Sequence, residues 1–233
     1  MNQSTMKVCI VIPAFNEEKS IYPVIRDILQ LHPDFSVLVV NDGSSDRTAQ
    51  AAKSAGAHVI TLPQNLGIGG AVQTGYRYAA AKGFDVAIQV DADGQHKPGE
   101  LNKILEPIRQ GAADMVIGSR FVDKTGYRST IGRRTGIRLL SALITLITRQ
   151  PLKDVTSGFR AANRRIIDLF AEDYSSDYPE VDSLVMVKKR NFRILEVPVE
   201  MEQRQAGRSS ITALKSAYYM IKVSLSIMVK SFR

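Results

Sequence analysis

Two aspartates one residue apart, directly after an apolar run, constrain this chain more than any other feature. Residues 86–90 read Val-Ala-Ile-Gln-Val, and Asp91 and Asp93 follow within Asp-Ala-Asp-Gly-Gln-His. Side chains alternate along an extended segment, so the two carboxylates can point the same way. With the Gln95 amide oxygen they form an all-oxygen set, the kind that holds Mg²⁺ or Mn²⁺ while substrate phosphate completes the coordination shell. A phosphate-bearing substrate is therefore expected; the competing explanation is an ordinary Asp-Gly turn.

Short runs rich in Val and Ile alternate with helix-like segments along the chain. The expected strands are 8–12, 37–40, 58–62, 86–90 and 115–117. The expected crossover helices are 17–31, 46–55, 69–81 and 98–109. This alternation predicts an α/β fold, in which a mostly parallel sheet is covered by helices on both faces.

Polar clusters follow three of the expected strands: residues 13–18, residues 41–46 and the Asp91/Asp93 pair. In such sheets ligands bind beyond the carboxyl ends of the strands, so the three clusters should meet at one edge. The glycine-rich segment 65–70 has neither the spacing nor the position of a dinucleotide fingerprint. We therefore expect neither a nicotinamide nor a flavin cofactor.

The composition favours one large domain with a C-terminal appendage, because 233 residues with 44% hydrophobic content can bury a full core. The single cysteine, Cys9, lies in an apolar run and is expected in the core, so no disulfide framework exists. The start of the chain lacks a signal-like apolar stretch. Residues 139–148 are too short for the roughly 20 residues that a transmembrane helix needs.

The net charge of +8 is unevenly distributed. Residues 1–119 hold 10 Lys and Arg against 12 Asp and Glu, whereas residues 120–233 hold 21 against 11. A basic half can serve a nucleic acid, an anionic membrane or a phosphorylated ligand. A nonenzymatic nucleic-acid-binding or membrane-binding protein would explain this half but leave the Asp91/Asp93/Gln95 cluster without a role, so we expect no nucleic-acid partner.

Seven motifs in order make the chain similar to a known family. They are residues 12–18, 40–46, 65–67, 91–96, 118–120, 156–160 and 196–199. Together they resemble the family 2 glycosyltransferases of the GT-A fold, most closely the branch with dolichol-phosphate mannosyltransferases and bacterial polyprenyl-phosphate glycosyltransferases. The resemblance implies a catalytic domain over residues 1–210, with a Rossmann-like, mostly parallel sheet sandwiched by helices.

The resemblance also implies roles for individual residues. The nucleotide-binding set would be Pro13, Phe15, Glu17, Asp42, Asn65, Gly67 and Asp91. The Mg²⁺ or Mn²⁺ ligands would be Asp91, Asp93 and Gln95. The acceptor phosphate would contact Arg120, Ser157 and Arg160. The catalytic set would be Asp93, Arg120, Arg160 and the mobile-loop arginine Arg204, while His96 is expected in a supporting role.

The acceptor decides whether a catalytic base is needed. A sugar hydroxyl must lose a proton as it attacks, whereas a phosphate monoester is already anionic near neutral pH. With polyprenyl phosphate as acceptor, Glu180 and Asp182 would position the acceptor or the donor sugar. In the alternative, a glycan hydroxyl attacks and one of these two carboxylates is the base. By resemblance the transfer inverts the anomeric configuration, and UDP-glucose, UDP-N-acetylglucosamine and GDP-mannose all remain open as donors.

The C-terminal segment 211–233 is expected to be an amphipathic helix, with Lys and Arg on one side and apolar residues on the other. This pattern is typical of a helix lying on an anionic membrane, and equally of one packed on its own domain or on a subunit partner. Residues 137–148, bracketed by arginines, offer a second interfacial element. The expected location is the cytoplasmic face of the cell membrane, held there peripherally or with a small integral membrane protein. The product would serve assembly of cell-wall and other glycans.

Overall fold

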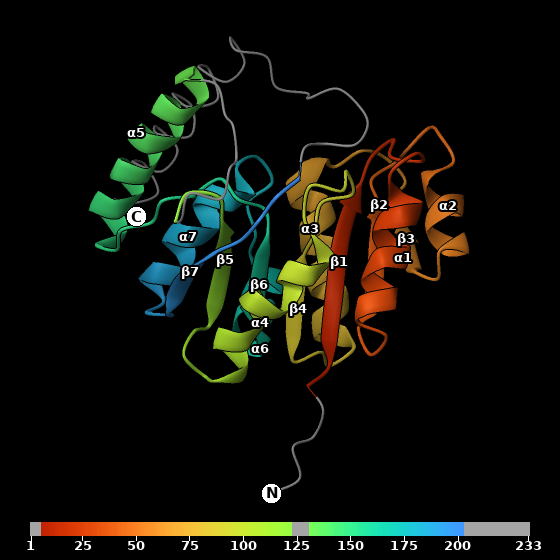
Figure 1. Ribbon diagram of the computed structural model, residues 1–233, viewed down its shortest axis with the longest axis horizontal. Helices are drawn as coiled ribbons and strands as arrows, with labels where there is room; N and C mark the ends of the chain where they lie inside the picture. The colour runs from red at the N-terminus through yellow and green to blue at the C-terminus, as the bar shows by residue number, and fades with distance from the viewer. Residues whose placement is uncertain (1–5, 123–130, 203–233) are drawn as a thin grey trace, which may run out of the picture.

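The computed structural model describes residues 6–122 and 131–202, and gives only the backbone for residues 131–137. Its centre is a seven-stranded sheet in the order β3-β2-β1-β4-β6-β5-β7 (Figure 1). The strands are β1 (Val8–Ala14), β2 (Ser36–Asn41), β3 (His58–Thr61), β4 (Val86–Gln89), β5 (Met115–Ser119), β6 (Arg160–Asn163) and β7 (Ile194–Pro198). The helices are α1 (Ile21–Leu31), α2 (Thr48–Ser54), α3 (Gly67–Ala81), α4 (Leu101–Arg109), α5 (Ile131–Thr148), α6 (Arg164–Glu172) and α7 (Pro179–Lys189), and the short 3₁₀ helix η1 (Pro98–Glu100) precedes α4.

Helices cover both faces of the sheet, as the sequence predicts. On one face the buried side chains of α3, α5, α6 and α7 form a continuous core with the sheet. On the other face α1, α2 and α4 do the same. Alternate residues of β1 enter the two cores, with Cys9 in the first and Ile10 in the second. The predicted burial of Cys9 is thereby confirmed.

Helical spacing of apolar residues explains why these segments fold as they do. In α1 the buried residues are Ile21, Val24, Ile25 and Ile28, three or four positions apart, which places them on one face. α1 begins at Ile21 and not at residue 17, because residues 17–20 form a turn in which the Ser20 and Ile21 N–H groups both donate to the Glu17 carbonyl.

Two strands of the sheet go beyond the five expected from sequence. β6 runs antiparallel between β4 and β5, and β7 extends the sheet parallel to β5. The sequence of β6, Arg-Ala-Ala-Asn, lacks the β-branched residues that mark a strand. Its antiparallel course brings Arg160 opposite Gln89, at the end of the sheet where the parallel strands finish.

Within the described residues, no helix has both the length and the apolar character needed to cross a bilayer. The amphipathic helix expected over 211–233 lies outside the described residues, as does the end of the expected 1–210 domain.

Candidate active site

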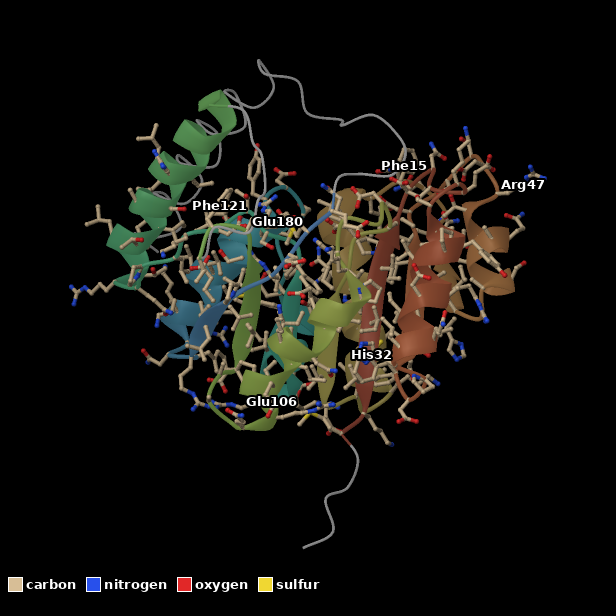
Figure 2. The ribbon with its side chains drawn as sticks, viewed as in Figure 1. Phe15, His32, Arg47, Glu106, Phe121 and Glu180 are labelled. Atoms are coloured by element: carbon tan, nitrogen blue, oxygen red, sulfur yellow. The ribbon has the colours of Figure 1, made fainter. Side chains whose placement is uncertain are left out.

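The polar clusters do lie at one edge of the sheet. Figure 2 shows Phe15, which follows β1, together with Phe121 and Glu180 at this edge, whereas His32 and Glu106 lie at the opposite end. Phe15 is about half exposed, at 48%. The carboxyl ends of β1, β2, β4 and β5 all point toward this edge, since β1, β2 and β4 are parallel and both β4 and β5 run antiparallel to β6. The α/β architecture places a ligand at such an edge.

The two aspartates belong to a tight turn after β4. The Asp91 N–H donates to His96 Nδ1 at 3.0 Å, and the Gln95 N–H donates to Asp93 Oδ1 at 3.0 Å. Gly94 at the centre has a φ of +80°, a conformation that favours glycine. The turn is thus closed by its own hydrogen bonds, which fix where the Asp93 carboxylate sits.

His96 is buried and closes this turn through its ring nitrogen. Its ring stacks on Phe159 at 4.6 Å between centroids, and burial lowers its pKa to about 4, so the ring is neutral at pH 7. Because Nδ1 accepts the Asp91 N–H, the ring hydrogen resides on Nε2, 3.5 Å from Asp91 Oδ2. The supporting role expected for His96 therefore agrees with its position.

Asp91, Asp93 and Gln95 fit a divalent cation that keeps few protein ligands. Among the described residues, no group of three or more His, Cys, Asp or Glu side chains could hold a metal ion, so the candidate donor set stays the one expected from the sequence, two carboxylates and an amide. Such a set suits Mg²⁺ or Mn²⁺ sites that recruit substrate phosphate. Backbone crowds the site, since a Cβ on Gly158 would lie 3.2 Å from Asp91 Oδ1. Gln95 Nε2 also makes a long contact of 3.4 Å with the Glu202 carbonyl.

Three of the expected nucleotide-binding residues, Asp42, Asn65 and Gly67, are joined by hydrogen bonds. Asp42, only 4% exposed, accepts the Leu66 N–H on Oδ1 and the Gly67 N–H on Oδ2, at 2.7 and 2.9 Å. Asn65 Oδ1 also accepts the Gly67 N–H. Asp42 therefore orients the start of α3, a role that the sequence-based expectation of nucleotide binding did not include.

The loops after β1 and β2 are fastened to one another. Asn16 donates its N–H to Ser44 Oγ at 2.9 Å and accepts the Ser45 N–H on its side chain at 2.9 Å. Glu17 donates its N–H to Thr48 Oγ1 at 2.8 Å, and its carboxylate accepts the Ser20 hydroxyl at 2.7 Å. Pro13 is buried within β1, opposite Val40. These hydrogen bonds hold the loop that carries Phe15 against the loop after β2.

Arg120 lies on the other side of the edge, directly after β5, in a tight ion pair. Its Nε and Nη2 reach the two carboxylate oxygens of Asp154 at 2.7 Å each, and its own N–H donates to Asp154 at 3.0 Å. Nη2 also donates to Thr156 Oγ1 at 3.2 Å. The Arg120 and Asp154 side chains are 9% and 0% exposed.

Ser157 and Arg160, expected at the acceptor phosphate, are buried and bonded within the protein. The Ser157 hydroxyl donates to the Gly118 carbonyl at 2.6 Å. Arg160, 2% exposed, donates to the Ser157 and Val155 carbonyls and to the Ser183 hydroxyl. These contacts favour a structural role for Ser157 and Arg160, in which they hold the backbone next to the site, over direct binding of phosphate.

Glu180 and Asp182 lie in the first turn of α7. Burial raises the pKa of Glu180. The positive charge of Arg160 opposes this rise, and the negative charge of Asp91 adds to it, so Glu180 interacts electrostatically with both residues. Asp182 is 5% exposed and accepts the Ser175 hydroxyl at 2.6 Å. The structure thus brings Glu180 to the edge that carries the site, whereas Asp182 is buried and bonded to Ser175.

Sequence reasoning missed Asp154 and Gly158, and it quoted Glu196 only within a motif. Asp154 gave no local signal, because its partner Arg120 is 34 residues away. Gly158 stood inside a quoted motif, yet its closeness to Asp91 depends on β6 lying next to β4. Arg204 lies outside the described residues.

A helix-covered sheet with an Asp-Ala-Asp turn directly after β4 is the arrangement that the resemblance to GT-A glycosyltransferases implied. The chain matches Glycosyl transferase family 2 over residues 9–170 and belongs to that family. It is therefore an enzyme, a glycosyltransferase, and the resemblance of its motifs is confirmed.

Its relatives include several lipid-phosphate enzymes. The undecaprenyl-phosphate mannosyltransferase of Micrococcus luteus is 33% identical over 89% of this chain and 88% of the relative. The polyprenol monophosphomannose synthase of Mycolicibacterium smegmatis is 28% identical over 94% and 86%. A UDP-N-acetylglucosamine–dolichyl-phosphate N-acetylglucosaminyltransferase of Methanococcus voltae is 30% identical over 83% and 84%.

Solved structures agree with the fold. Glucosyl-3-phosphoglycerate synthase from Mycobacterium tuberculosis, in complex with Mn²⁺, UDP and phosphoglyceric acid, superposes with a TM-score of 0.72 at 20% identity, over 97% of this chain and 78% of that chain. The same enzyme with Mg²⁺ and UDP gives a TM-score of 0.70 at 21% identity, over 97% and 79%.

Proposed function

We propose that this enzyme transfers one sugar from a nucleotide-sugar donor to polyprenyl phosphate, with inversion at the anomeric carbon. The observation that carries the proposal is the Asp91–His96 turn, which sets two carboxylates at the carboxyl edge of the sheet. The names of the relatives support the acceptor, since three of them act on undecaprenyl, polyprenol or dolichyl phosphate.

On the donor side, Phe15 would lie against the nucleoside, and Asp42 would shape its pocket by holding residues 65–67. Asp91, Asp93 and Gln95 would hold Mg²⁺ or Mn²⁺, which when bound would neutralise charge on the donor diphosphate as it leaves. Both metals accompany UDP in solved structures of the same fold. UDP-glucose, UDP-N-acetylglucosamine and GDP-mannose are the donors to test.

On the acceptor side, Arg120 would bind the lipid phosphate, because a guanidinium stays charged and binds phosphate oxygens strongly. A phosphate oxygen attacks without losing a proton, so the protein has only to align it and screen charge. Glu180 would then position the sugar or acceptor. In the alternative, a glycan hydroxyl attacks with Glu180 or Asp182 as base, and the raised pKa of Glu180 is the feature that favours it.

We also propose that the enzyme works at the inner membrane surface. Leu139 and Leu146, seven positions apart on α5, are 66% and 77% exposed, while Leu140 and Ile144 are buried. Arg138 and Arg149 are exposed as well. Apolar side chains flanked by cations suit an anionic membrane. Flotation with anionic liposomes should weaken in Leu139→Gln/Leu146→Gln, and undiminished binding of this variant would exclude α5 as a docking element.

The proposal is tested by a transfer assay. Each radiolabelled donor is incubated with polyprenyl phosphate in detergent and Mg²⁺ or Mn²⁺, and label entering the organic phase is counted. We expect label from one donor, abolished by EDTA. No label from any donor, with native membranes added to supply a protein partner, would contradict the proposal and favour a hydroxyl acceptor.

A further inference from the structure

A second carboxylate lies behind the Arg120–Asp154 pair. Glu196, on the edge strand β7, accepts the Lys153 N–H on Oε2 at 2.8 Å and the Asp154 N–H on Oε1 at 2.6 Å. Both of its oxygens are thus bonded to the backbone that carries Asp154. Asp154 in turn holds two nitrogens of the Arg120 guanidinium.

The backbone leading into Asp154 is tied to the same strand a second time. Gln150 Nε2 donates to the Ile194 carbonyl of β7 at 2.7 Å. Segment 150–154 is therefore fixed to β7 at two points, although it belongs to no regular element. β7 pairs with β5, and β5 ends directly before Arg120. The positions of Arg120 and Asp154 are therefore both set by this pair of strands.

We propose that Glu196 is a positioning residue for the acceptor phosphate, acting through Asp154 to hold the guanidinium of Arg120 in its binding orientation. This inference rests on the proposed function for the identity of the acceptor. Glu196 does not itself contact the acceptor. Its two bonds fix the position of the Asp154 backbone, and the two-point contact from Asp154 then fixes the plane of the guanidinium.

Glu196→Gln tests this relay with almost no change in size. An amide offers one acceptor oxygen in place of two, so one backbone N–H loses its partner. We expect the KM for polyprenyl phosphate to rise about fivefold to tenfold, while kcat and the KM for the nucleotide sugar stay within about twofold. The matched control is Glu106→Gln, which changes an exposed carboxylate on α4 that accepts a hydrogen bond from Gln110, just after the helix. A merely structural role would lower the melting temperature and change both KM values together, which would overturn the proposal.

A double-mutant cycle asks whether Glu196 acts through Arg120. Arg120→Lys keeps the charge but loses the two-point contact with Asp154. If Glu196 works through that contact, Glu196→Gln/Arg120→Lys will have the same KM for polyprenyl phosphate as Arg120→Lys alone. Multiplicative effects of the two changes would contradict the proposal.

A measurement without acceptor separates this inference from the proposed function. The Arg120 Nε–H signal in ¹⁵N NMR, assigned by its loss in Arg120→Lys, should exchange with water at least about fivefold faster in Glu196→Gln than in the wild type. An unchanged exchange rate would overturn the positioning role. If the wild type transfers no sugar to polyprenyl phosphate, the proposed function fails, while this signal still decides whether Glu196 holds Arg120.

Discussion

The two sides of the site hold their charged groups in different ways. On the donor side, the turn after β4 orients its aspartates with bonds that span only two and five residues. On the acceptor side, Arg120 is held by Asp154, 34 residues away, and Asp154 by Glu196, 42 residues further on. The turn proposed to hold the metal is thus fixed by local hydrogen bonds, whereas the proposed acceptor side is fixed by an ion pair and hydrogen bonds that exist only once the chain has folded.

The donor side should show the largest effect on activity. Asp93→Asn removes a carboxylate that is 7% exposed and fixed by the Gln95 N–H. We expect transfer to fall by at least about a hundredfold, because leaving-group charge is then poorly neutralised. The radiolabel assay measures this, with the exposed Asp34→Asn as the control. Activity within about tenfold of wild type would show that the turn is not the catalytic centre.

The acceptor side should show the largest effect on stability. Asp154→Asn removes the negative charge and one of the two oxygens that accept from the buried Arg120 guanidinium. We expect this to lower the free energy of unfolding by about 3 kcal/mol. Urea denaturation gives the value. Asp168→Asn breaks an exposed pair with Arg164 and should cost less than about 1 kcal/mol. Equal costs for the two variants would contradict a stabilising role for the buried Arg120–Asp154 pair.

The pH dependence of stability probes the donor turn. Burial lowers the pKa of His96 to about 4, against about 6.5 in an unfolded chain, so the unfolded state binds more protons between these values. Stability without metal should therefore be full above pH 6.5 and fall by up to about 3 kcal/mol as the pH drops to 4. Urea titrations at several pH values, in EDTA, measure this loss.

His96→Gln should flatten that pH profile, because the titrating group is gone. His58→Gln, which changes an exposed histidine, is the control and should leave the profile as in the wild type. A profile of His96→Gln as steep as that of the wild type would mean that other groups carry the pH dependence.

The smallest effect tests where the two sides meet. In Gly158→Ala the new Cβ would lie 3.2 Å from Asp91 Oδ1 and 3.0 Å from Gln89 Nε2, so Asp91 must shift by a few tenths of an ångström. We expect Mn²⁺ affinity, followed by EPR, to weaken about threefold to tenfold with the fold intact. Gly99→Ala, where a Cβ meets nothing within 4 Å, should leave the affinity unchanged. Equal affinities for both variants would show that Gly158 does not limit the site.

The sequence predicted the turn after β4 better than the surroundings of Arg120, and the reason is physical. Strand, turn and carboxylate are consecutive there, so periodicity and turn chemistry place Asp91 and Asp93 directly. The expected strands and the two helix layers follow from the same local patterns. Strand β6 was missed because its two alanines are both buried, one on each helix-covered face of the sheet. Its sequence therefore shows no alternation of apolar and polar residues.

The arginines were harder to interpret, since their partners cannot be read from spacing. Arg160 looks like a phosphate ligand in the sequence, yet folding buries it against Ser157 and Ser183. Arg120 likewise gives no sign of Asp154. The partners of a buried cation are placed next to it by the tertiary structure. They are distant in sequence, so a short stretch of sequence around the arginine does not reveal them.

Transfer of the sugar to a phosphate oxygen leaves a direct mark on the product, which NMR of the purified glycolipid detects. We expect an anomeric proton coupled to ³¹P, in the configuration opposite to that of the donor. An anomeric proton without coupling to phosphorus would contradict the acceptor, and a retained configuration would contradict the single displacement.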